Sequence, residues 1–93
     1  MRRFRSFYRT SDGAADYQFL FEEQADGTWR AYITEQPSYR TRPNDAHSTH
    51  RLSDGERKYV CWTDPLESLE EAKQVAALWA NATQNYIRTG KSF

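Results

Sequence analysis

The fold class is decided by SLEEAKQVAALWANATQNYIRTG, residues 68–90, in which apolar side chains recur at the spacing of an α-helix. One broad stripe is formed by Leu69, Ala72, Val75, Ala76, Trp79, Thr83, Tyr86 and Ile87. Ser68 and Glu71 form a capping box at the start, and Gly90 suits the position just after the last turn. The pattern therefore predicts one helix of about twenty residues, whose apolar stripe must pack against a second layer.

That second layer is predicted by the residues upstream, where apolar and polar side chains alternate as in half-buried strands. The clearest strands are DYQFLFEE (16–23) and TWRAYITE (28–35), joined by the turn pair Asp26-Gly27. RRFRSFYRT (2–10) indicates an edge strand or an arm, and residues 47–62 hold two strand-like runs around an Asp-Gly pair. We therefore predict an α+β fold, in which an antiparallel sheet of about four or five strands, joined as meander-like hairpins, packs against one long C-terminal helix.

Two segments are less determined by the sequence. A two-residue turn at Asp54-Gly55 would place Arg51 opposite Lys58, and like charges directly opposite each other are unfavourable. The register of residues 47–62 therefore stays open, with a bulge or a longer loop as the alternative. Residues 36–46, QPSYRTRPNDA, contain two prolines and no periodicity, so we expect a loop that is the least ordered part of the domain.

Size and composition favour a single folded domain over residues 1–93. Three Trp, six Tyr and five Phe are more than a disordered chain carries, although the mean hydropathy is −0.99. Thirteen basic and thirteen acidic residues cancel, so no global field attracts nucleic acid or an anionic membrane. The single cysteine excludes an internal disulfide, and no apolar run is long enough to span a bilayer. We therefore expect a cytoplasmic protein with no membrane association.

Charge is unevenly distributed along the chain. Residues 1–10 carry four arginines and no acid, whereas residues 11–28 carry five acids and no base. Opposite charges on neighbouring strands attract each other. We expect the basic N-terminal segment to lie against the acidic one in the folded sheet.

Cys61, within YVCWTDPLESLEEA (59–72), is the one candidate for thiol chemistry, and His50 is a conceivable partner. Its immediate neighbours are apolar, which favours the neutral thiol. It precedes the predicted helix by about seven residues, which is too far for the helix dipole to act on it. We interpret Cys61 as a packing residue at the end of a strand.

A metal site is a further candidate, because His47, His50, Cys61 and Asp64 are all residue types that zinc accepts. His47 and His50 cannot point to the same side of a regular strand, and no Cys-x-x-Cys pair accompanies them. The adjacent carboxylates at 22–23 and 70–71 are explained by opposite strand faces and by helix capping. We predict no metal, no cofactor and no enzymatic activity, with a metal- or thiol-dependent role as a minor alternative.

The sequence favours a small interaction module that binds another macromolecule, and a protein partner is preferred. The expected contact surface is the 37–46 loop, with Tyr39, Arg40 and Arg42, together with adjoining sheet residues such as Arg51. Arginine and tyrosine are enriched at the energetic centres of protein interfaces. The oligomeric state stays open.

The alternative is a single-stranded nucleic-acid-binding protein that uses the N-terminal segment. Arg3, Arg5 and Tyr8 belong to a run that interleaves guanidinium and aromatic groups. In single-strand binders, bases stack on such rings while arginines follow the phosphates. This patch would be extended by Tyr39, Arg40 and Arg42 in the loop and by Arg51, Arg57 and Lys58.

The C-terminal third, with YVCW, PLESLEEA, WANATQNYIRTG and the final KSF, resembles short uncharacterised proteins carried on bacterial mobile elements. The resemblance rests on no catalytic motif and supplies no active-site residues. It implies an accessory role, for instance the modulation of a host or element-encoded nucleoprotein machine.

Overall fold

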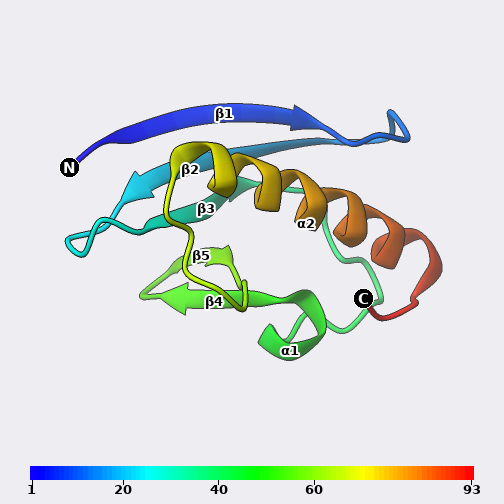
Figure 1. Cartoon of the computed structure of the whole chain (residues 1–93). Coiled ribbons are helices and arrows are strands. Elements are labelled where there is room, and N and C mark those ends of the chain that lie inside the picture. The colour runs from blue at the N-terminus through cyan, green and yellow to red at the C-terminus, as the bar shows by residue number, and fades with distance from the viewer.

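The computed structural model describes residues 1–93 as one antiparallel sheet with a long helix across one of its faces (Figure 1). The predicted α+β arrangement is therefore confirmed. The elements in chain order are β1 (Arg3–Arg9), β2 (Asp16–Glu23), β3 (Trp29–Glu35), α1 (Ala46–Thr49), β4 (Arg51–Asp54), β5 (Arg57–Val60) and α2 (Leu69–Thr89). No helix of the structure is long and apolar enough to cross a membrane.

The strand order across the sheet is β1-β2-β3-β5-β4. The first three strands form the expected meander, but the last hairpin enters the sheet in reverse order. β5 carries the half-buried Tyr59 and the buried Val60, whereas most of β4 is exposed. The inner position therefore goes to the strand with more apolar surface to bury, and the outer edge goes to the polar strand.

The open question of register in this hairpin is answered by where the chain turns. Asp54 pairs with Arg57, so Gly55 and Glu56 form the turn. Gly55 has a φ of 63°, a left-handed value that favours glycine at the first turn position. Arg51 then lies opposite Val60, which avoids the unfavourable pairing with Lys58.

The core lies between α2 and the sheet face that is turned toward it. It consists of Tyr17, Phe19, Phe21, Trp29, Ala31, Val60, Leu66, Ala72, Val75, Ala76, Trp79 and Ala80. Trp79 packs edge-on against the rings of Tyr17 and Phe19 at centroid distances of 5.8 and 6.1 Å. Its indole N–H donates a hydrogen bond of 3.0 Å to the backbone oxygen of Thr49. One side chain therefore connects the helix α2, the strand β2 and the α1 segment.

Both predicted helix caps are confirmed. The Ser68 hydroxyl accepts a hydrogen bond from the backbone N–H of Glu71 at 3.1 Å, and Gly90 adopts a left-handed φ of 77°. Arg42 completes the C-terminal end, because its Nε donates to the oxygen of Ile87 and its Nη2 to the oxygen of Arg88, both at 3.2 Å. These bonds fix the 40–42 segment to the end of α2.

We predict that Gly90→Ala lowers the free energy of unfolding by about 1–2 kcal/mol, because a left-handed φ disfavours any side chain with a Cβ. The new Cβ would also lie 2.8 Å from Nη1 of Arg42, so that guanidinium must move away from the carbonyl groups it caps. Urea unfolding measures the cost. Gly13→Ala is the control, because Gly13 has a similar φ of 72° and nothing within 4 Å of the added Cβ. An equal cost at both positions would show that Arg42 adds no stability.

Candidate functional site

The N-terminal arginines are largely neutralised by the neighbouring strand. Along β1 and β2, Arg3 lies opposite Glu22 and Arg9 opposite Asp16, and N–O distances in these ion pairs are 3.8 and 2.9 Å. Arg2 pairs with Glu23 at 3.6 Å. This confirms that the basic segment lies against the acidic one. Of the four arginines in the segment, only Arg5 has no acidic partner.

The aromatic residues of β1 lie on opposite faces of the sheet. Tyr8 is half-buried on the helix side, and its hydroxyl accepts a hydrogen bond of 2.8 Å from Nδ2 of Asn81. Phe7 is on the other face with 74% of its surface exposed. Tyr8 therefore attaches β1 to α2, and it offers no free ring to a base.

The 36–46 loop packs against the domain more closely than its sequence suggests. Tyr39 is buried with Tyr86 and Ile87 at the end of α2, and this burial raises the pKa of its hydroxyl. The guanidinium of Arg51 lies 4.9 Å from the centre of the Tyr39 ring and donates to Gln36, Asn44 and Thr49. Tyr39 and Arg51 thus help to hold the loop in place, and their role as contact residues for a partner stays a prediction.

The predicted binding residues do not form one patch. Arg3 and Arg5 project from the face of the sheet that α2 leaves uncovered, opposite to the side of Tyr8. Arg40 and Arg42 lie instead beside the last turn of α2, on the helix side of the molecule. A continuous arginine surface that includes both groups is therefore absent from this fold.

On the face of the sheet that α2 does not cover, arginine side chains stack on tyrosine rings. Arg57 lies 3.5 Å above the centre of the Tyr32 ring and reaches Glu22 at 3.0 Å. Arg30 lies 4.4 Å above the centre of the Tyr59 ring. The rings are therefore covered by guanidinium groups from other strands, and they do not form an open platform for base stacking.

Hydrogen bonds complete this cluster. The Tyr32 hydroxyl donates to Oδ2 of Asp54 at 2.9 Å and accepts from Nη1 of Arg30 at 3.0 Å. Burial of the hydroxyl raises the pKa of Tyr32, and the hydrogen bond to Tyr32 raises the pKa of Arg30. Sequence reasoning missed this cluster because its arginines and tyrosines come from strands that are distant in the chain.

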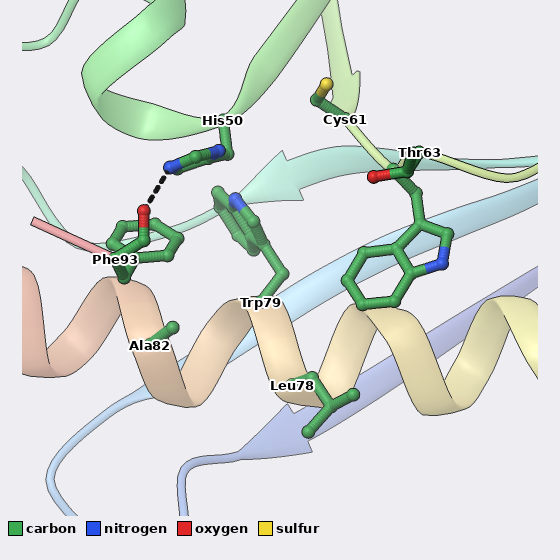
Figure 2. A pocket seen from close by; sticks show the side chains of 8 residues that line it. His50, Cys61, Thr63, Leu78, Trp79, Ala82 and Phe93 are labelled. Atoms are coloured by element: carbon green, nitrogen blue, oxygen red, sulfur yellow. Dashed lines mark hydrogen bonds between the residues drawn. The ribbon is translucent and has the colours of Figure 1, made fainter.

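The largest cavity is an apolar groove of about 480 Å³ beside α2 (Figure 2). It is lined by His50, Cys61, Trp62, Thr63, Leu78, Trp79, Ala82 and Phe93, and we call it the α2–β5 groove. It exists because α2 packs on β2 and β3 and leaves the β5–β4 half of the sheet less covered (Figure 1). Trp62, Leu78 and Phe93 keep 45%, 59% and 39% of their surfaces exposed.

Sequence reasoning missed this groove, although one signal was present. Leu78 falls outside the apolar stripe of the predicted helix, so its side chain could not belong to the core. Nothing in the sequence places Trp62 or Phe93 beside it. Large exposed apolar side chains that gather in one hollow are typical of binding sites.

The thiol in the groove has no activating partner. Cys61 is half-buried, and its backbone N–H donates to the oxygen of His50 at 2.8 Å. The His50 ring is directed at Phe93, where Nε2 lies 2.6 Å from the backbone oxygen, and not at the sulfur (Figure 2). This arrangement agrees with Cys61 as a packing residue at a strand end. No three histidine, cysteine, aspartate or glutamate side chains gather as a metal site.

In comparisons with known proteins, no family model matches the chain, and none of the curated proteins or solved structures matches it either. The class of the protein is therefore given by its fold, a five-stranded antiparallel sheet backed by one helix. Its function has to be argued from its own surfaces.

Proposed function

We propose that this chain is a small, non-enzymatic protein-binding module whose contact surface is the α2–β5 groove. The observation that carries the proposal is the exposure of Trp62, Leu78 and Phe93 around one apolar hollow. Water contact with these side chains is unfavourable, and a partner that covers them gains the corresponding free energy. Tryptophan in particular is enriched at the centres of protein interfaces.

The chemistry of the groove favours a protein over a nucleic acid. None of its lining residues is an arginine, a lysine or a carboxylate. The centres of protein interfaces are depleted in charged groups, whereas nucleic-acid surfaces depend on cations that follow the phosphates. The volume of about 480 Å³ suits one or two large apolar side chains from a helix or loop of the partner.

The N-terminal nucleic-acid surface stays a separate prediction with less support. Arg3 and Arg9 are paired with carboxylates, and Tyr8 is bonded to Asn81. On that strand, Arg5 and the exposed rings of Phe7 and Phe4 remain accessible to a ligand, although Phe4 also stacks on Trp29. The resemblance of the C-terminal third to mobile-element proteins favours an accessory, regulatory role for the module, in the cytoplasm.

We predict that Leu78→Glu reduces partner binding at least about tenfold, because it places a charge in the apolar contact. The fold should be unaffected, since Leu78 is exposed on α2. The measurement is a pull-down from nuclease-treated extract of the native host, with affinity then determined for the recovered protein. Phe7→Glu is the control, because it introduces the same charge at an exposed aromatic residue on the opposite face.

The comparison of the two variants decides the proposal. Proteins that are retained by the wild type and by Phe7→Glu but lost by Leu78→Glu bind at the groove. Loss with Phe7→Glu alone would move the contact to the uncovered sheet face and would contradict the proposal. A parallel pull-down from untreated extract tests the alternative, because recovery of proteins only without nuclease would favour nucleic-acid binding.

A further inference from the structure

A second hollow, of about 370 Å³, lies at the C-terminal end of α2. It is lined by Arg40, Thr41, Arg42, Gln84, Ile87 and Arg88, and we call it the arginine hollow. Its wall on one side is the 40–42 segment and on the other the last turns of the helix. Three arginines therefore line one small space, and no aspartate or glutamate is among the lining residues.

The donors of this hollow are held in place and are only partly used. Nε and Nη2 of Arg42 donate hydrogen bonds to carbonyl groups of the helix, and Nη1 has no hydrogen-bond partner. Arg88 gives Nη2 to Oδ1 of Asn85 at 2.9 Å. Gln84 accepts a hydrogen bond from the Tyr17 hydroxyl through Oε1, at 3.1 Å, so its amide N–H groups remain available. The side chain of Arg40 has no hydrogen-bonding or ionic partner in the chain.

The three arginines of the hollow have no ion pair, and no other group of three unpaired arginines lines one hollow of the molecule. The arginines that pair with carboxylates elsewhere are Arg2, Arg3, Arg9, Arg30 and Arg57. Asp12 is the carboxylate whose pKa is affected by the charge of Arg88. Hydrogen bonds from Thr10 and Ala14 lower the pKa of Asp12, and the positive charge of Arg88 lowers it less strongly. Both of those bonds are accepted by Oδ1 of Asp12, and no ion pair joins Asp12 to Arg88 or to the other arginines of the hollow.

The backbone at Arg40 adds an independent observation. Arg40 has a φ of 58°, a left-handed value that is unfavourable for a residue with a side chain. The backbone N–H of Arg40 donates a hydrogen bond of 3.0 Å to the Ser38 hydroxyl, and this bond supports the conformation. The chain therefore carries an arginine, and not the more favourable glycine, at this position in the wall of the hollow.

We propose that the arginine hollow binds a phosphate monoester. Such a group carries nearly two negative charges at neutral pH and presents three acceptor oxygens, which match the free donors around the hollow. The neighbouring rings of Tyr39 and Tyr86 are buried, so no aromatic surface lies beside the hollow for a base to stack on. A terminal phosphate on a protein side chain or a small molecule therefore fits better than a nucleic-acid strand. This site is separate from the α2–β5 groove and does not depend on the proposed function.

The test uses the full chain and defined probes. Fluorescence anisotropy is measured with a short blocked peptide that carries one phosphoserine, with its unphosphorylated form, and with a single-stranded oligonucleotide of mixed sequence. Inorganic phosphate and a sugar phosphate serve as competitors. We expect binding of the phosphopeptide but not of its unphosphorylated form, and displacement by both competitors. Displacement by the small phosphates without binding of the phosphopeptide would support the site and assign it to small molecules.

Variants locate the binding. Arg40→Gln and Arg88→Gln should each weaken it about tenfold, since each removes a charge-assisted hydrogen-bond donor that does not hold the fold. Lys73→Gln is the control, because it removes the same charge from an exposed site on α2, about 22 Å along the helix from Arg88. Leu78→Glu should leave phosphate binding in place, which separates this site from the groove.

Three results would overturn the proposal. The first is an absence of binding by every phosphate probe at low salt. The second is an equal loss in Lys73→Gln and in the arginine variants, which would reflect overall charge only. The third is binding of the oligonucleotide without binding of the phosphopeptide or of the small phosphates, with an affinity that falls steeply as salt is raised.

Discussion

Trp79→Ala should lower the free energy of unfolding by about 3–5 kcal/mol, a large part of the stability of a domain of this size. The indole is buried and packs edge-on against Tyr17 and Phe19. Its removal leaves a cavity in the core and also leaves the buried oxygen of Thr49 without its hydrogen bond. Calorimetry should show a midpoint that is lower by roughly 15–30 °C.

Two further substitutions separate the causes of this loss. Trp79→Phe keeps an aromatic ring but removes the N–H donor, so it should cost about 1–3 kcal/mol. Trp62→Ala removes the same side chain from the exposed wall of the groove and should cost under about 1 kcal/mol. A cost at Trp62 as large as that at Trp79 would contradict the placement of these two residues.

Tyr32→Ala should be the most destabilising change on the uncovered face of the sheet, at about 3 kcal/mol or more. Tyr32 is only 2% exposed although no other layer covers it, because Arg57 lies across its ring. The substitution removes this stacking and both hydrogen bonds of the hydroxyl, to Asp54 and from Arg30. Urea unfolding at low and at high salt measures the loss and its electrostatic part.

A double-mutant cycle shows whether the stacking itself contributes. Tyr32→Phe keeps the ring beneath Arg57 and should cost only about 1 kcal/mol, from the lost hydrogen bonds. Arg57→Ala combined with Tyr32→Ala should cost less than the two single changes together, by about 1 kcal/mol. Strict additivity would mean that the guanidinium only rests on the ring and does not stabilise it.

The parts of the fold that the sequence predicted are those with local causes. The ends of α2 are predicted by contacts within one helical turn, which involve Ser68 and Glu71 at the start and Gly90 at the end. The apolar stripe that includes Trp79 is predicted by the helical period alone. The alternation around Phe19 in the same way predicts the core strand. The reversed position of the β4–β5 hairpin depends on which strand buries more surface against α2, and that comparison requires the assembled sheet.

The surfaces were less predictable because their residues come from distant segments. Trp62 and Leu78 meet only after α2 has crossed the sheet, and Phe93 joins them from the last residues of the chain. The sequence indicates Arg40 and Arg42 as candidates, but nothing in it places Arg88 beside them. Tyr39 and Arg51 are residue types that are common at contact surfaces. Only the structure shows that their side chains pack within the domain and hold the loop.

The order of elements along the chain also constrains how the protein folds. The strand β2, which carries Tyr17, Phe19 and Phe21, precedes α2, so the ribosome makes the aromatic face of the sheet before it makes the helix that covers this face. The three local hairpins, β1–β2, β2–β3 and β4–β5, can form early, but the core closes only when Trp79 has been synthesised and docked. Until then the nascent chain presents a sheet of exposed rings, which is the kind of surface that chaperones and other nascent chains bind. The delay between the last strand and the helix is therefore the period in which this protein is most prone to aggregate.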